Sequence, residues 1–97
     1  MNNAAAAAKA KMVAMTEARS TEQLFSDLAV LESQTVGYGT EEQRLVAAII
    51  SDTIETRHNL TPALEAIFDD EEWFGTYNEA LRMALLSTYA TVALADA

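Results

Sequence analysis

The chain has 97 residues, no cysteine and a net charge of −9 at pH 7. This length suits one small domain, and the missing thiols exclude disulfides and thiolate zinc sites. Nineteen alanines against three glycines and one proline favour helix, and no alternating run of β-branched residues predicts a strand.

The N-terminal segment, residues 1–19, is rich in alanine and basic. It carries three basic side chains and one acid, a net charge of +2, whereas residues 20–97 carry three arginines and fourteen acids, a net charge of −11. Because an isolated helix of this length is marginal, the segment is either a tail or an extra helix that extends the fold or meets a partner. The acidic remainder repels phosphates, so we expect no direct nucleic-acid binding and favour a partner with a basic surface.

The next helix is predicted over about residues 21–33. Ser20 or Thr21 can cap it, and Gln23 stands at the spacing of a capping box with Ser20. The connection of residues 34–39 is short and holds two glycines, which indicates antiparallel neighbours. The apolar stripe of this helix consists of Leu24, Phe25, Leu28 and Leu31.

The clearest helix is predicted over residues 41–58. Thr40 and Gln43 form a second capping box, and Asn59 suits the left-handed position that ends a helix. One half of its circumference is apolar and the other polar at about 100° per residue. The apolar half contains Leu45, Val46, Ile49, Ile50, Thr53 and Ile54, and the polar half contains Arg44, Ser51, Asp52 and Glu55.

Glu55 and His58 have the Glu-x-x-His spacing found in di-iron bundles. That site needs a second copy of the motif and two further glutamates, and both side chains are expected to project away from the apolar half. We therefore predict no metal and no cofactor. With one histidine, no cysteine and no nucleophile motif, we predict no catalytic residues and a protein that is not an enzyme.

A short helix is predicted over residues 62–72, with Thr61 as the N-cap and Pro62 as its first residue. Leu64, Ile67 and Phe68 supply its buried side. Residues 69–72 are four adjacent acids, which cannot all be solvated on one narrow stripe of a helix, so we expect the helix to loosen or end there.

These acids and the two aromatic residues after them are the predicted partner-binding site. Aromatic residues anchor many interfaces, and acids steer a basic partner toward them. A calcium loop is disfavoured, because aromatic side chains occupy positions that should hold oxygen ligands. The remaining alternative places both aromatic residues in the core and leaves the acids solvated. The site consists of Asp69, Asp70, Glu71, Glu72, Trp73 and Phe74.

The last helix is predicted over residues 77–94, with Thr76 and Glu79 as a third capping box. This helix is apolar around much of its circumference, which predicts either a central position in the bundle or a homodimer contact. Tyr77, Leu81, Ala84, Leu85, Tyr89 and Val92 share one face, and Met83, Leu86 and Leu94 lie off it.

The run EEQRLVAAIISDTIETRH, residues 41–58, resembles small, acidic, helical, uncharacterised proteins of actinobacteria and their phages. This resemblance covers about a fifth of the chain and implies no catalytic residues. It is carried by Glu42, Arg44, Leu45, Val46, Ala48, Asp52, Glu55, Arg57 and His58.

Together these patterns predict an all-α protein, a small antiparallel bundle of three to four helices. Residues 20–97 form the bundle domain, and residues 1–19 precede it. No apolar run reaches the roughly 18 residues of a membrane span and no signal-peptide pattern is present, so we expect a cytoplasmic protein that does not bind membranes. The predicted function is a protein–protein interaction or regulatory module. The alternatives are a structural homo-oligomer, such as an assembly or virion component, and an acidic nucleic-acid mimic that inhibits a DNA-binding protein.

Overall fold

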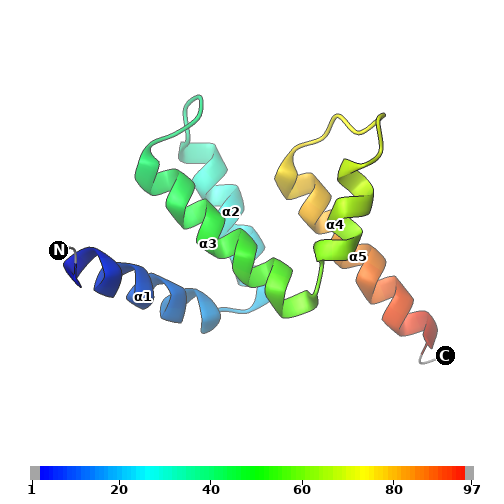
Figure 1. Cartoon of the computed structure of the whole chain (residues 1–97), viewed down its shortest axis with the longest axis horizontal. Helices are drawn as coiled ribbons and strands as arrows, with labels where there is room; N and C mark the ends of the chain where they lie inside the picture. The colour runs from blue at the N-terminus through cyan, green and yellow to red at the C-terminus, as the bar shows by residue number, and fades with distance from the viewer. Residues whose placement is uncertain (1–2, 96–97) are drawn as a thin grey trace. The chain divides into compact units, whose positions relative to one another are not determined.

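The computed structural model describes the backbone of residues 3–95 and the side chains of residues 4–89. Within this range the chain forms five helices and no strand (Figure 1), which confirms the all-α class. Three to four helices is too low a number, because the chain is helical from residue 3 onward and the short helix over residues 61–68 is a separate element. The helices are α1 (Asn3–Glu17), α2 (Thr21–Gln34), α3 (Glu41–His58), α4 (Thr61–Phe68) and α5 (Tyr77–Ala95).

The chain divides into two compact units, and the division falls between Thr53 and Ile54, inside α3. The first unit contains α1, α2 and most of α3. The second contains the end of α3 together with α4 and α5. Packing of all the helices into one antiparallel bundle stays a prediction.

The three predicted capping boxes are confirmed at the starts of α2, α3 and α5. In each, the backbone N–H of the third helical residue donates to the cap hydroxyl at 3.1–3.2 Å. The side chain of that residue accepts from the backbone N–H of the cap at 2.8–3.4 Å. A cap of this kind stabilises a helix by about 1 kcal/mol. The pairs are Ser20 with Gln23, Thr40 with Gln43, and Thr76 with Glu79.

The end of α3 is a complete Schellman motif, with Asn59 in the predicted left-handed conformation at φ 53°. The N–H of Leu60 donates to the carbonyl of Glu55 at 2.9 Å, and the N–H of Asn59 donates to that of Thr56 at 3.4 Å. Leu60 is fully buried. The motif therefore satisfies the last carbonyls of α3 and turns the chain into α4.

Helix α4 begins one residue earlier and ends four residues earlier than predicted. Thr61 is its first helical residue and Leu60 holds the N-cap position, because the Thr61 hydroxyl donates to the Glu55 carboxylate at 2.9 Å instead of capping. The helix stops at Phe68 with Asp69 as its C-cap, so it ends at the four adjacent acids, as expected.

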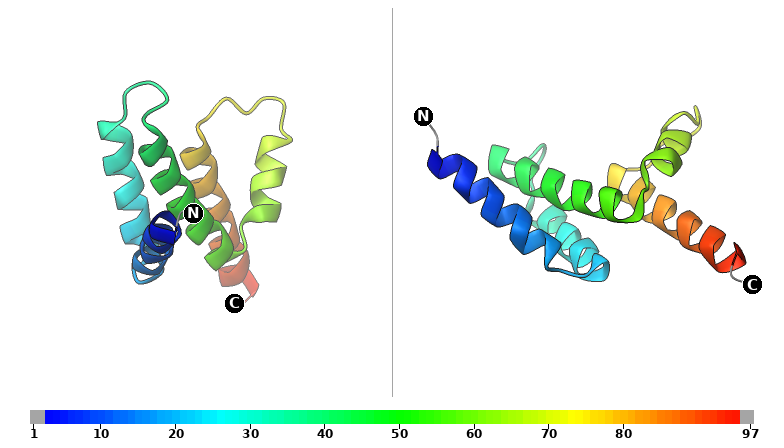
Figure 2. Two further views of the ribbon diagram at one scale, coloured as in Figure 1. Left: turned by 60° about the vertical axis from the view of Figure 1, so that its left-hand side comes forward. Right: turned by 60° about the horizontal axis from the view of Figure 1, so that its bottom comes forward.

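The first unit buries side chains from all three of its helices. Leu24, Phe25 and Leu28 of α2 are buried as predicted, as are Ile49 and Ile50 of α3. Helices α2 and α3 lie side by side and are joined by residues 35–40 (Figure 2). At the α1–α2 connection, Arg19 Nη2 donates to Asp27 Oδ1 at 2.9 Å.

The buried side of α3 is rotated from the predicted one. Ser51, assigned to the polar half, is 7% exposed, whereas Leu45, assigned to the apolar half, is 43% exposed. Ser51 precedes the buried Ile54 by three residues, so it lies beside Ile54 on the helix surface. The positions of the neighbouring helices decide which side of α3 is covered. The hydrophobic pattern of α3 alone does not specify those positions.

The second unit has a core built from α4, α5 and the end of α3. Helix α4 packs on α5. Two small alanines of α5 are fully buried, which lets other side chains come close to that helix. The core residues are Ile54, Leu60, Leu64, Ala80, Leu81, Ala84 and Leu85.

Candidate protein-interaction site

The acidic-aromatic segment, residues 69–74, lies between α4 and α5 and is bracketed by an aromatic pair. The rings of Phe68 and Tyr77 stack with centroids 5.9 Å apart and planes 14° from parallel. The Tyr77 hydroxyl donates to Glu55 Oε2 at 2.9 Å. These contacts join both ends of the connection to the end of α3.

The segment follows a path of turns that leaves its four acids exposed. The backbone N–H of Asp70 donates to the carbonyl of Ile67 at 3.2 Å, and that of Trp73 donates to the carbonyl of Asp70 at 3.0 Å. The Asp70 carboxylate accepts the backbone N–H of Glu72 at 3.0 Å. Asp70 therefore shapes the loop as well as contributing charge.

Trp73 is half-buried and folds back over Gly75. A Cβ on Gly75 would lie 2.3 Å from the Trp73 ring and 2.6 Å from Glu79 Oε2, so only glycine permits this approach. The indole Nε1 is buried and has no hydrogen-bond acceptor among the described residues. A buried N–H without a partner is unfavourable, and the half-buried indole is folded against the loop and does not extend into solvent.

Phe74 is 92% exposed. The alternative that placed both Trp73 and Phe74 in the core is therefore wrong for Phe74, because the turn that folds Trp73 inward directs the next side chain out. The site that the structure assembles is one exposed aromatic ring beside four exposed carboxylates. Adjacency in sequence indicated the group, but nothing in the sequence indicated which aromatic residue faces solvent.

Two further exposed apolar side chains were missed by sequence reasoning. Val36 and Tyr38 lie in the glycine loop, residues 35–40, and are 90% and 92% exposed. Gly37 and Gly39 both have positive φ, 62° and 74°; Val36 precedes the first of them and Tyr38 lies between the two. The sequence signal was present, since alternating glycines in a short loop indicate such conformations.

Glu55 and His58 are partly exposed and contact α5 through their side chains, which corrects the prediction that both project away from the packed side. Glu55 accepts from Thr61 and Tyr77, each at 2.9 Å. The His58 ring meets Tyr89 edge to face, with centroids 5.6 Å apart. Burial, and then the positive charge of Arg57, lowers the pKa of His58 below its ordinary value of 6.5.

The Glu-x-x-His pair thus acts as a structural junction at the end of α3. Across the described residues, no group of three or more acidic or histidine side chains is placed to hold a metal ion. Within the same part of the chain, no helix has the length and apolar character needed to cross a bilayer.

Comparison of the chain with protein-family models, curated proteins and solved structures found no match. The all-α class is therefore established by the helices themselves.

Proposed function

We propose that this chain is a non-enzymatic protein–protein interaction or regulatory module that binds a basic partner through residues 69–74. The observation that carries the proposal is the exposure of Phe74 next to Asp69, Asp70, Glu71 and Glu72. An aromatic ring buried on association contributes much of the free energy of an interface. Neighbouring acids accelerate association with a positively charged surface and select against acidic partners.

The anchoring of the segment supports this function. The Phe68–Tyr77 stack and the packing of Trp73 on Gly75 hold the segment on both sides of Phe74. A surface that is ordered before binding loses less conformational entropy on association than a mobile one. A partner therefore meets Phe74 and the acids already in place.

The second candidate function is a structural homo-oligomer that associates through α5. Met83, Leu86 and Tyr89 are about half exposed or more on this helix, and such apolar side chains are typical of helices that pair with another subunit. The side chains of Val92 and Leu94, predicted to contribute, lie outside the described residues.

Capture from a native-host lysate tests the leading proposal. The test variant combines Phe74→Ala with Glu71→Lys and should lose a binding protein that the unaltered chain retains. The matched control combines Tyr38→Ala with Glu42→Lys, which removes an equally exposed aromatic ring and reverses one charge elsewhere. Equal capture by both variants, or loss from the control alone, would contradict the proposal. Circular dichroism checks that both variants keep their helices.

A further inference from the structure

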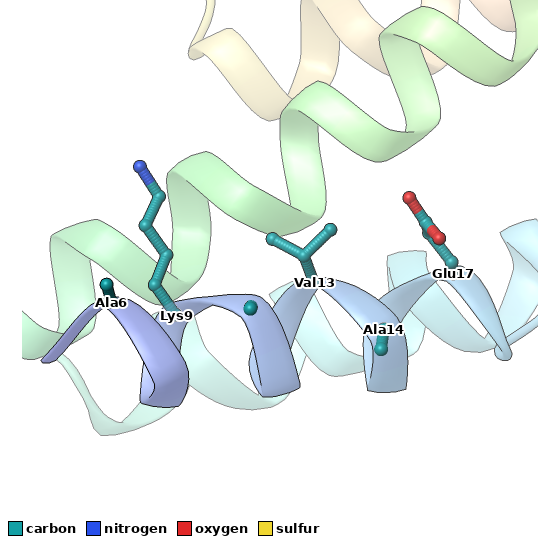
Figure 3. A pocket seen from close by; sticks show the side chains of 6 residues that line it. Ala6, Lys9, Val13, Ala14 and Glu17 are labelled. Carbon is teal, nitrogen blue, oxygen red and sulfur yellow. The ribbon is translucent and has the colours of Figure 1, made fainter. Parts of the chain in front are cut away.

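Two surfaces outside the cores differ in what they indicate about function. The hollow along α1 has a volume of about 410 Å³, and the described residues that line it all belong to α1. Figure 3 shows Lys9 and Glu17 extending from the same side of this helix. Because its charges have both signs, the hollow favours no class of partner. The connection of residues 69–76, yellow in Figure 1, instead contains a contrast between two adjacent aromatic side chains.

Trp73 and Phe74 lie in environments opposite to those that their chemistry favours. Phe74 has no polar side-chain atom, yet it is 92% exposed. Trp73 carries a donor, yet its indole Nε1 is buried and has no acceptor among the described residues. The Glu79 carboxylate, which also lies close to Gly75, accepts the backbone N–H of Thr76 at 3.4 Å instead. Burying the phenyl ring and exposing the indole would remove both costs.

The backbone around these two residues is able to change conformation while the helices stay folded. Residues 73–76 lie outside every helix. Gly75 directly follows the aromatic pair, and glycine adopts backbone conformations that other residues avoid. The ends of the connection are held independently, by the stacking of Phe68 on Tyr77 with centroids 5.9 Å apart and by the capping box of α5. The rings of the pair can therefore exchange while both ends remain in place.

We propose that Trp73 and Phe74 exchange places and that this exchange controls the availability of the interaction site. In the first state, the one described above, Trp73 packs on Gly75 and Phe74 is presented beside the acids. In the second state Phe74 packs on Gly75, and the indole extends into solvent, where water accepts from Nε1. A partner that buries Phe74 binds the first state only, so its apparent affinity falls as the second state becomes populated. This inference rests on the proposed function, because it names the regulation of the same site.

Swapping the two side chains by mutation tests whether a phenyl ring fits the place of the indole. The swapped chain combines Trp73→Phe with Phe74→Trp. Its control combines Trp73→Ala with Phe74→Trp and leaves the place beside Gly75 empty. Because the phenyl ring restores apolar contact, the folding equilibrium constant of the swapped chain should exceed that of the control by roughly fivefold to tenfold in urea denaturation. Equal stability of the two chains overturns the proposal.

Acrylamide quenching of the chain's one tryptophan tests the exchange itself. Phe74→Ser removes the apolar ring that the second state buries, so Trp73 should stay on Gly75 and its quenching constant should fall. Phe74→Leu keeps an apolar side chain that fills the same place, and should lower the quenching constant less. Tyr38→Ser, at an equally exposed aromatic residue of the glycine loop, should leave it unchanged. A quenching constant that is unchanged or raised in Phe74→Ser overturns the proposal.

Failure of this exchange is distinct from failure of the proposed function. Both measurements use the free full-length chain, and circular dichroism checks that every variant keeps its helices. Exchange in a chain that captures no partner through Phe74 would contradict the proposed function and leave the exchange standing. Capture through Phe74 by a chain whose rings do not exchange would contradict this inference alone.

Discussion

Two loops carry the most exposed aromatic side chains, Tyr38 in residues 35–40 and Phe74 in residues 69–76, and they are held in different ways. The glycine loop is shaped by backbone conformation, with Gly37 and Gly39 at positive φ. Its carbonyl groups also accept hydrogen bonds, since Arg44 Nη1 donates to the carbonyl of Gly39 at 2.9 Å.

The second loop is shaped by side chains. Trp73 packs on Gly75, Phe68 stacks on Tyr77, and the Tyr77 hydroxyl reaches Glu55, 22 residues earlier. Equal exposure of Tyr38 and Phe74 therefore results from different kinds of interaction. The glycine loop is determined by two local conformations and contains no charged residue, whereas the second loop combines contacts between distant residues with four exposed carboxylates.

The largest effect is expected for Gly39→Ala in the glycine loop. An alanine there must adopt a positive φ, and its Cβ would lie 2.7 Å from Thr35 Cγ2 and 2.8 Å from Gln43 Oε1. Gln43 is a member of the α3 capping box, so strain also reaches the helix start. We expect a loss of about 2–3 kcal/mol in the free energy of unfolding, measured by urea denaturation.

Gly37→Ala is the matched control for that prediction. Gly37 also has a positive φ, but a Cβ there meets no atom within 4 Å. Its substitution should cost only the conformational strain, about 1 kcal/mol. Equal losses at Gly37 and Gly39 would show that side-chain contacts do not contribute to the glycine loop.

Sequence reasoning succeeded where the interactions are local. Each capping box joins residues three apart, and the left-handed Asn59 completes a motif within six residues, so short patterns contain the information. It failed where distant residues decide the outcome. The covered side of α3, which includes Ser51, depends on the neighbouring helices.

The residue types of the candidate site were predictable from the sequence, but the orientation of its side chains was not. The run of four acids and two aromatic residues indicated a charged surface, and the acids end α4 as expected. The orientation of Phe74 and Trp73 was not predictable, because it depends on the approach of an indole to Gly75 and on a contact between Tyr77 and Glu55. Patterns of hydrophobicity do not encode such contacts.

An intermediate effect is expected for Gly75→Ala in the second loop. The new Cβ would overlap the far edge of the Trp73 ring, which can swing outward at a cost of about 1 kcal/mol. Trp73 is the chain's one tryptophan, so its fluorescence should shift to the red and become more accessible to acrylamide. Gly37→Ala should leave the fluorescence unchanged. An unchanged spectrum in Gly75→Ala would refute the side-chain account of this loop.

The smallest effect on stability is expected from the titration of His58, which lies in the second unit. Burial lowers the pKa of His58 in the folded chain, so the unfolded chain takes up its proton first as the pH falls. Stability from this residue is therefore present above the ordinary histidine pKa and is lost as the pH decreases through that value toward the folded one. Because the chain has one histidine, this contribution belongs to the end of α3 and its contact with Tyr89.

Urea denaturation of the unaltered chain and of His58→Gln, on either side of that pH range, should show a steeper loss of unfolding free energy for the unaltered chain. Parallel losses would mean that carboxylates alone set the acid sensitivity and that the His58–Tyr89 contact does not depend on the charge of the imidazole.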